Sequence, residues 1–296
     1  MTGVEAAWAL ERPASLIPGA GMDEDAIPPE EKPHLESIRQ WVFDHTGLCF
    51  EERKRFVLYR RLETLRWRLG LSSLQDMAWQ LAEQTCPQLA VQVACAVSTN
   101  HTFFFREIEM LQRLFQVATP QLPSGEVWRI WSAAAASGDE AYTMAILLAE
   151  ALGMPQAQER AAILGTDISH PMIDQAEHGV YAEQKLELVP PSLFKRYFQP
   201  VGLGQWRVAP ALKRMCTFRR MNLKSAPWPF KNPFHIILCR NVLYYFDRAH
   251  QERLVERLYD VAAPNGWLLT SATETLHGLN TRWRKVDVGI FRKAEG

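Results

Sequence analysis

The feature that most constrains this chain is a change of pattern after its first third. From about residue 127, apolar runs of strand length alternate with helical stretches: VWRIWSAA precedes YTMAILLAEALG, AAILGTD precedes PMIDQAEHG, and FHIILCRN precedes HQERLVERLYDVA. A last apolar run, GWLLTSAT, follows near the end. Such alternation is typical of βαβ units, which form a parallel sheet with helices on both faces. We therefore predict an α/β domain over residues 127–296.

The segment before this domain has a different texture. From residue 34 to about residue 115 every stretch is predicted to be helical. Gly70 is expected to end one of these helices, and Ser72-x-x-Gln75 resembles the capping box of the next. One helix face is marked by leucines at spacings of four, three and four: Leu58, Leu62, Leu65 and Leu69.

These patterns divide the chain into parts. Residues 1–32, with several prolines and an acidic run, predict a mobile tail. A helical domain at 33–115 and a turn-rich linker at 116–126 follow. Within the α/β domain the alternation breaks at about residues 185–217, where VGLGQWRV predicts a hairpin in a small subdomain. The apolar run at 283–291 predicts antiparallel edge strands.

Composition excludes several classes of function. Lys plus Arg and Asp plus Glu balance at 33 each, so no net field draws the whole chain onto nucleic acid or a membrane. No apolar stretch approaches the ~20 residues of a membrane span, and no signal peptide is recognisable. The cysteines form no CxxC pair and the histidines no HExxH motif, so we expect no disulfide framework and no metal site. We expect a cytoplasmic protein.

The turn after the first predicted strand, SAAAASGDEAY at residues 132–142, indicates the ligand. Ligands of open α/β sheets bind at the carboxyl ends of the strands. A phosphate-binding loop would carry several glycines and no adjacent acids, whereas this turn has one glycine followed by Asp139 and Glu140. These carboxylates suit the amine and sulfonium of S-adenosylmethionine. Asp167, which ends the next strand, suits the hydroxyls of its ribose.

Both turns also have a structural interpretation. Ser137-x-x-Glu140 fits a capping box, and Asp167 fits the cap of a helix that begins near Pro171. For either residue taken alone, the two interpretations stay open. Because an acid follows each of two successive strands, the pattern as a whole favours a nucleoside ligand.

Three segments resemble a known family. STNHTFFFRE (98–107), IWSAAAASGDEAY (130–142) and CRNVLYYF (239–246) are similar, in this order, to motifs of the chemotaxis receptor glutamate methyltransferases, the CheR family. The resemblance extends over residues 35–293. It implies a Rossmann-like S-adenosylmethionine methyltransferase fold with a small all-α N-terminal domain and a β-hairpin insert. It also implies that receptor glutamates are converted to methyl esters, with S-adenosylhomocysteine as the second product.

The same resemblance implies the site residues. Arg106 and Tyr245 would align the acceptor glutamate beside the transferred methyl group. The family's GEE is GDE here, which keeps Glu140, and the family's GHSE-like segment reads SATE at 271–274. The cofactor would contact Asn100, Thr102, Arg106, Ala134, Glu140, Asp167, Asn222, Leu223, Arg240 and Asn241.

The chemistry of methyl transfer agrees with these assignments. A glutamate side chain, with a pKa of about 4.3, is already ionised at neutral pH, so its methylation needs no general base. The enzyme has to align two groups and keep water away from the nucleophile. Arg106 and Tyr245 are therefore expected to hold the carboxylate through hydrogen bonds and not to transfer protons.

A cluster of cations occupies the segment before Gly70. Clusters of this kind are usually solvated helix faces, but this one would attract acidic receptor helices, so we expect it to dock the chemoreceptor. Two alternatives stay open: a methyltransferase acting on a small carboxylic acid or RNA, and a non-catalytic module that senses the cofactor or a signal. The sequence does not define the oligomeric state. The cations are Arg53, Lys54, Arg55, Arg60, Arg61, Arg66 and Arg68.

Overall fold

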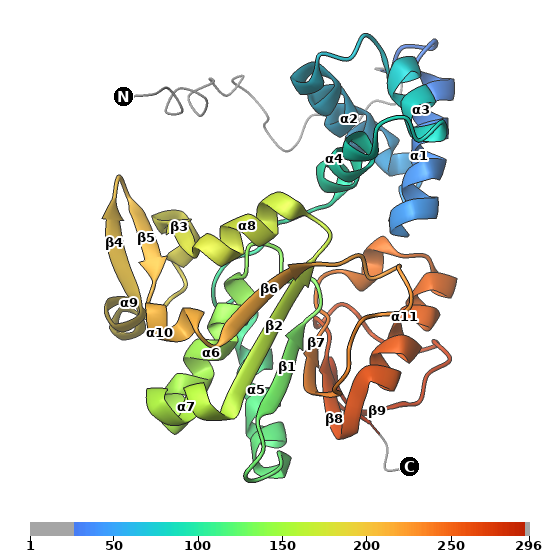
Figure 1. The fold of residues 1–296 in the computed structure, drawn as a ribbon. Coiled ribbons are helices and arrows are strands. Elements are labelled where there is room, and N and C mark those ends of the chain that lie inside the picture. The colour runs from blue at the N-terminus through green and yellow to red at the C-terminus, as the bar shows by residue number, and fades with distance from the viewer. Residues whose placement is uncertain (1–26, 294–296) are drawn as a thin grey trace.

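The computed structural model describes residues 27–293, which form a helical bundle above an α/β unit with a small lobe at its side (Figure 1). Most of the predicted mobile tail, residues 1–26, lies outside the described residues. The first described residue, Ile27, is buried among the leucines of the bundle. The bundle consists of α1 (Lys32–Thr46), α2 (Arg55–Leu69), α3 (Leu74–Ala82) and α4 (Pro87–Val97).

The ends of α2 and α3 follow local rules. Gly70, with φ 65°, takes the left-handed conformation and ends α2, as predicted. The predicted cap of α3 was wrong by one residue. Ser73, not Ser72, has the extended backbone that lets its hydroxyl accept the N–H of Asp76. The predicted leucine face of α2 is confirmed, since Leu58, Leu62 and Leu65 are buried and Leu69 packs against the same core.

The main sheet has the strand order β6-β2-β1-β7-β8-β10-β9. From β6 to β8 the strands are parallel, and β10 is antiparallel to both its neighbours, which confirms the predicted antiparallel edge. The prediction missed β6, because only Phe218 of this edge strand is buried and no apolar run marks it. The strands are β1 (Trp128–Ser132), β2 (Ala161–Asp167), β6 (Cys216–Arg220), β7 (Phe234–Leu238), β8 (Ala262–Leu269), β9 (Trp283–Asp287) and β10 (Ile290–Lys293).

Successive strand residues point to opposite faces and build two cores. Ile130 of β1 belongs to the core beneath α5, α6 and α8, whereas its neighbour Trp131 belongs to the core beneath α11. Leu111 and Leu114 place α5 on the sheet, although most of this helix falls in the predicted helical domain of residues 33–115. The helices of this unit are α5 (Ile108–Ala118), α6 (Asp139–Leu152), α7 (Met154–Arg160), α8 (His170–His178) and α11 (Arg248–Val261).

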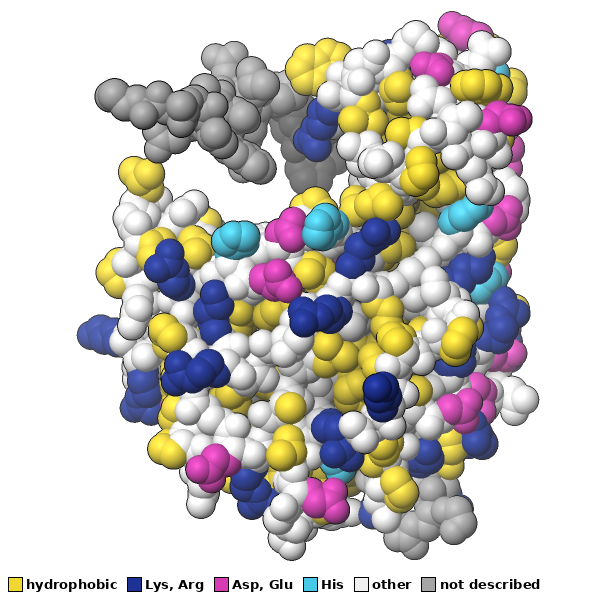
Figure 2. Space-filling model, in the orientation of Figure 1, with side chains coloured by type: hydrophobic (Ala, Val, Ile, Leu, Met, Phe, Trp, Pro, Cys, Tyr) yellow, Lys and Arg dark blue, Asp and Glu magenta, His cyan; other side chains and the backbone are white. Residues whose placement is uncertain are grey.

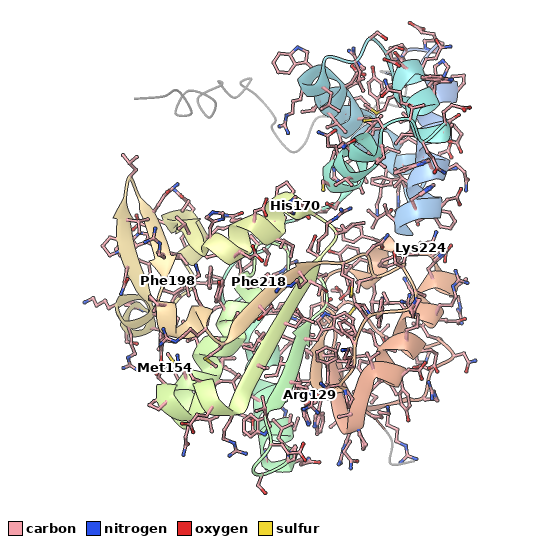
Figure 3. All side chains as sticks on the ribbon, viewed as in Figure 1. Arg129, Met154, His170, Phe198, Phe218 and Lys224 are labelled. Atoms are coloured by element: carbon pink, nitrogen blue, oxygen red, sulfur yellow. The ribbon has the colours of Figure 1, made fainter. Side chains whose placement is uncertain are left out.

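The small lobe is an antiparallel sheet of three strands in the order β3-β5-β4. The hairpin of β4 and β5 confirms the expected insert, and β3 joins it from before residue 185. Phe198, labelled in Figure 3, begins β4 and is buried against the α/β unit. The elements are β3 (Val180–Ala182), α9 (Pro191–Tyr197), β4 (Phe198–Gly202), β5 (Gln205–Val208) and α10 (Pro210–Lys213).

Short 3-10 turns connect these parts: η2 (Glu52–Lys54), η3 (Thr119–Gln121), η4 (Glu183–Leu186) and η5 (Leu243–Tyr245). Among residues 27–293, no helix has the length and apolar character to cross a bilayer. On the face shown in Figure 2, Lys and Arg side chains are scattered over the α/β unit and lobe without gathering into one basic patch.

Hydrogen bonds that involve backbone groups at the end of α1 and just after it connect the bundle to the carboxyl edge of the main sheet. Lys224, which Figure 3 shows just below the end of α1, donates to the carbonyls of Phe43 and Asp44. The side-chain amide of Asn222 donates to the His45 carbonyl at 2.7 Å. The Cys49 N–H donates to the Tyr245 carbonyl at 2.7 Å. The bundle therefore closes one side of the space above the strand ends.

Candidate active site

A cleft lies above the carboxyl ends of β1 and β7, where the strand order reverses and open α/β sheets bind their ligands. About 940 Å³ of empty space lies between its walls and at its open mouth. Thr46 and Leu48 of the bundle line one side. The structure also brings together here all the site residues that the family resemblance implies: Asn100, Thr102, Arg106, Ala134, Glu140, Asp167, Asn222, Leu223, Arg240, Asn241 and Tyr245.

The turn after β1 is built from small residues because it is tightly enclosed. Gly138 has φ 87°, and a Cβ on it would lie 2.8 Å from the Cβ of Ala176, so glycine is required. The capping-box interpretation of Ser137 and Glu140 was wrong, since no side chain caps α6. Glu140 turns away from the helix end and accepts a hydrogen bond from the Ser132 hydroxyl at 2.7 Å.

Asp167 joins the turns after β1 and β2. Its two oxygens accept the N–H groups of Ala136 and Ser169, each at 2.9 Å. Burial raises the pKa of the Asp167 carboxyl, and the hydrogen bonds from Ser169 and Ala136 oppose this rise. Ser169 and not Asp167 is the N-cap residue of α8, and no side chain caps that helix. A carboxylate has further lone pairs, so Asp167 can still accept bonds from a ligand in the cleft.

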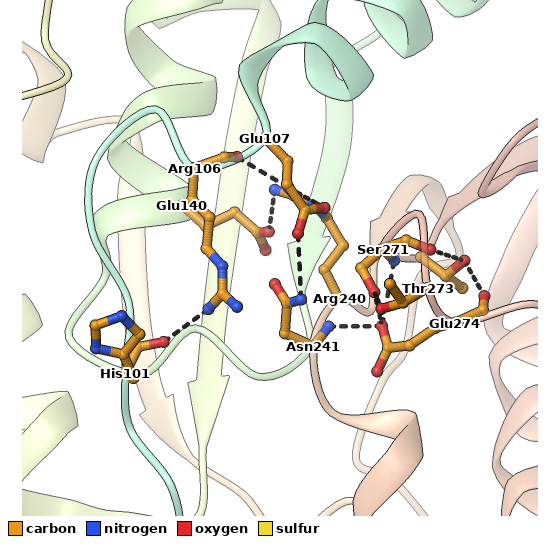
Figure 4. Close-up of polar contacts among 10 residues, drawn as sticks. His101, Arg106, Glu107, Glu140, Arg240, Asn241, Ser271, Thr273 and Glu274 are labelled. Atoms are coloured by element: carbon orange, nitrogen blue, oxygen red, sulfur yellow. Dashed lines mark hydrogen bonds and ion pairs between the residues drawn. The ribbon is translucent and has the colours of Figure 1, made fainter. Parts of the chain in front are cut away.

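Arg240 is the centre of a buried ion cluster (Figure 4). Its guanidinium donates to Glu140 at 2.9 Å, to Glu107 at 3.1 Å and to the Arg106 carbonyl at 2.9 Å. The side chain is only 2% exposed. Arg240 thus pairs with two carboxylates, of which Glu140 lines the cleft together with Asp167. Carboxylates at this wall suit a cationic ligand such as a sulfonium with an ammonium group.

Arg106 and Tyr245 both line the cleft. The guanidinium of Arg106 donates to the His101 carbonyl at 2.7 Å and makes no other hydrogen bond within residues 27–293, so donors remain for a ligand. The hydroxyl of Tyr245 lies 3.5 Å from that of Tyr244. Burial, followed by this hydrogen bond, raises the pKa of Tyr244, so its hydroxyl stays protonated at neutral pH.

The other predicted residues have partners of their own. The side chain of Asn222 accepts the Lys224 N–H, in addition to its bond to the bundle, and Leu223 is nearly buried beside it. Asn241 has a left-handed backbone, with φ 56°, and its amide lies 3.4 Å from Glu107. Asn100 accepts the hydroxyl of Ser98 at 3.2 Å. Thr102 and Ala134 contribute to the wall of the cleft.

Asp139 does not face the cleft, although the sequence analysis placed it with Glu140 on the ligand. It is fully buried and forms an ion pair with Lys185 at 3.2 Å. Lys185 also donates to the Ser137 hydroxyl, and the Tyr181 hydroxyl donates to the Ser137 carbonyl at 2.6 Å. Lys185 and Tyr181 lie at the start of the lobe, so the lobe braces the turn after β1.

Sequence reasoning also missed two carboxylates that hold residues of the cleft: Glu107 pairs with Arg240, and Glu274 accepts the Asn241 N–H. Glu107 stands in the STNHTFFFRE segment, and Glu274 in SATE, so both had a signal in the sequence. Lys185 had none, because its partner lies 46 residues earlier in the chain.

The sheet with one reversed strand beside an open parallel core, and the cleft with carboxylates above it, fit the class of S-adenosylmethionine-dependent methyltransferases. The chain matches two family models, "CheR methyltransferase, SAM binding domain" over residues 100–291 and "CheR methyltransferase, all-alpha domain" over residues 33–94. It therefore belongs to the CheR methyltransferase family.

Curated relatives are similar to this chain along most of their length. The chain is 35% identical to the chemotaxis protein methyltransferase 2 of Pseudomonas aeruginosa, over 88% of this chain and 92% of that protein. It is 33% identical to the chemotaxis protein methyltransferase of Salmonella typhimurium, over 83% and 85%. It is 30% identical to that of Borreliella burgdorferi, over 83% and 89%.

The brace between lobe and turn gives a first prediction. We expect Lys185→Met to weaken binding of S-adenosylhomocysteine about 10-fold, because the buried Asp139 loses its cation and the turn after β1 loosens. Calorimetric titration measures this affinity. Lys195→Met, which removes an exposed lysine of α9, is the matched control and should bind like the unaltered protein. Equal affinity in the two variants would show that the lobe does not support the turn.

Proposed function

We propose that the protein transfers the methyl group of S-adenosylmethionine to glutamate side chains of chemoreceptors, forming methyl esters and S-adenosylhomocysteine. One observation carries the proposal. The acid-lined cleft for a cationic cofactor is also lined by an arginine with free donors and by a tyrosine, which are the groups that an acceptor carboxylate requires. The relatives named chemotaxis protein methyltransferases support a chemoreceptor as the substrate.

The cofactor residues divide by chemistry. Glu140 accepts a hydrogen bond from the cofactor's ammonium group, since Arg240 already holds this carboxylate in place. Asp167 accepts the ribose hydroxyls. Asn222 and Leu223 lie beside the adenine, where the bundle meets the sheet. The remaining contacts come from Asn100, Thr102, Ala134, Arg240 and Asn241.

The acceptor residues align and do not exchange protons. Bound S-adenosylmethionine supplies a methyl group activated by a sulfonium. Arg106 pairs with the ionised acceptor carboxylate, and the Tyr245 hydroxyl orients one of its oxygens. Thr46 and Leu48 cover the cleft from the bundle and help to exclude water, which would otherwise solvate the nucleophile.

The docking surface is part of α2 and the turn before it. Several of the seven predicted cations have partners within the protein: Arg61 donates to the Val97 carbonyl and to Thr99, and Arg66 pairs with Glu63. Arg53 and Arg55 also form ion pairs. Among the residues that the structure describes, no side-chain partner is found for Lys54, Arg60 and Arg68. We assign receptor docking to these three, in a cytoplasmic setting.

Charge reversal of the docking surface gives a second prediction. We expect Arg60→Glu with Arg68→Glu to lower kcat/KM for the receptor about 10-fold at low ionic strength, because α2 then repels an acidic helix. Added salt should narrow the difference by screening. The control, Arg284→Glu with Lys285→Glu on β9, changes the net charge equally at a distant exposed site. Equal losses of kcat/KM in the two double variants would show that α2 is not part of the docking surface.

The acceptor is tested by the stability of the label. The protein is incubated with methyl-labelled S-adenosylmethionine and membranes that contain chemoreceptors. A methyl ester releases its label as methanol in mild alkali, so we expect base-labile label on the receptor band. Alkali-stable label would indicate nitrogen methylation, and label on RNA or on a small acid would identify a different acceptor.

A further inference from the structure

A buried carboxylate lies behind the acceptor side of the cleft, at the carboxyl end of β8. Glu274 is 5% exposed and does not line the cleft. One oxygen accepts the Asn241 N–H at 2.6 Å together with the N–H and hydroxyl of Ser271 (Figure 4). The other oxygen accepts the Leu243 N–H at 2.7 Å. Within residues 27–293 these donors, and no cation, satisfy the carboxylate.

The backbone that Glu274 holds has an unusual conformation. Asn241 has φ 56°, a left-handed value, and Val242 follows with φ −134° and ψ −29°. This sequence of conformations turns the N–H groups of Asn241 and Leu243 toward one point, which makes a concave site for an anion. A left-handed backbone at a residue other than glycine persists where the surrounding structure holds it. The carboxylate of Glu274 supplies that hold.

The segment held in this way leads from residues assigned to the cofactor to the acceptor residue Tyr245. It begins at Arg240 and Asn241 and continues into η5, which ends at Tyr245. Its far end is bound separately, by the Cys49 N–H of the bundle. Glu274 thus fixes the near end of a short segment whose far end presents the Tyr245 hydroxyl to the cleft.

The anion site needs two acceptor oxygens, because the N–H groups of Asn241 and Leu243 donate to different oxygens of Glu274. An amide of the same shape would accept one N–H group and present its own N–H₂ to the other. The isosteric change to glutamine therefore breaks the anion site while it keeps the volume of the side chain.

We propose that Glu274 is a positioning residue for methyl transfer: through the N–H groups of Asn241 and Leu243 it sets the place of Tyr245 against the acceptor carboxylate. This inference rests on the proposed function of Tyr245. The catalytic geometry then depends on a carboxylate that touches neither substrate nor cofactor and that lies in the SATE segment after β8, which departs from the family pattern.

The test separates cofactor binding from turnover. For Glu274→Gln we expect kcat for receptor methylation to fall about 10- to 100-fold, the cost of a small misplacement, while the affinity for S-adenosylhomocysteine changes less than about threefold. Glu274→Asp, which keeps the charge but cannot reach both N–H groups, should show the same separation. The control is Glu256→Gln, since Glu256 also accepts a backbone N–H, that of Arg282, far from the cleft.

A double-mutant cycle with Tyr245→Phe distinguishes positioning from general destabilisation. If Glu274 acts through Tyr245, Glu274→Gln should cost less than about threefold in kcat when the tyrosine hydroxyl is already absent. Full additivity would overturn the proposal, as would unchanged kcat in the single variant. Loss of S-adenosylhomocysteine binding in both Glu274 variants would assign a structural role and overturn it too. Failure of the unaltered protein to methylate receptors would contradict the proposed function instead.

Discussion

Replacement of Arg240 by methionine is expected to destabilise the protein by about 3–5 kcal/mol, because it leaves the carboxylates of Glu107 and Glu140 facing each other without a cation. For a chain of this size the melting temperature should fall by about 10 °C. Binding of S-adenosylhomocysteine should be lost as well, since Glu140 is no longer held toward the cleft. Thermal denaturation and calorimetric titration measure the two effects.

Arg282 offers a matched control for this prediction. It too pairs with two carboxylates, those of Glu256 and Asp260, but its side chain is 52% exposed. Arg282→Met should therefore cost no more than about 1 kcal/mol, as exposed ion pairs do, and should leave cofactor binding intact. If Arg240→Met melts at the same temperature as Arg282→Met, the ion cluster does not stabilise the site.

Asp167→Asn is expected to weaken cofactor binding about 10- to 100-fold, the loss of hydrogen bonds from two ribose hydroxyls to a charged acceptor. Stability should fall as well, because the amide can accept only one of the N–H groups of Ala136 and Ser169, although removal of a buried charge offsets part of this loss. Asp76→Asn in α3, whose carboxylate bonds to Ser72 and Gln80, is the control and should bind normally. If Asp167→Asn and Asp76→Asn bind the cofactor with equal affinity, Asp167 does not contact the ribose.

The raised pKa of Asp167 also gives this prediction a pH dependence. The ribose hydroxyls donate to the ionised carboxylate, so affinity should be full above the pKa of Asp167 and should weaken as the pH falls through it. Because burial shifts this pKa upward, the weakening begins at a higher pH than for an exposed aspartate. Asp167→Asn should show no such dependence between about pH 4 and about pH 7.

Local patterns in the sequence were sufficient for most of the fold. Alternating apolar runs marked β1, β2, β7 and β8, since central strands of a parallel sheet are buried on both faces. The edge strand β6 was not predicted, because its side chains are mostly exposed and form no apolar run. The three-strand lobe was recognised only by its hairpin, because β3 has three residues.

The site was predictable where motifs carry it. Residues after β1, β2 and β7 meet in one cleft because parallel strands end at the same edge. The contacts that support them come from distant parts of the chain, as with Lys185 on Asp139 and Arg240 on Glu107, and no local pattern marks such pairs. Asp139 was misassigned for this reason, since sequence alone does not reveal that a lysine of the lobe neutralises it.

Calorimetric titration of S-adenosylhomocysteine into the purified protein tests the central claim, that the cleft above β1 and β7 is a cofactor site. We expect saturable heat corresponding to one molecule per chain, and competition by S-adenosylmethionine for the same site. Absence of heat with both ligands would contradict the account, because every role assigned to the residues of the cleft depends on that molecule being bound there.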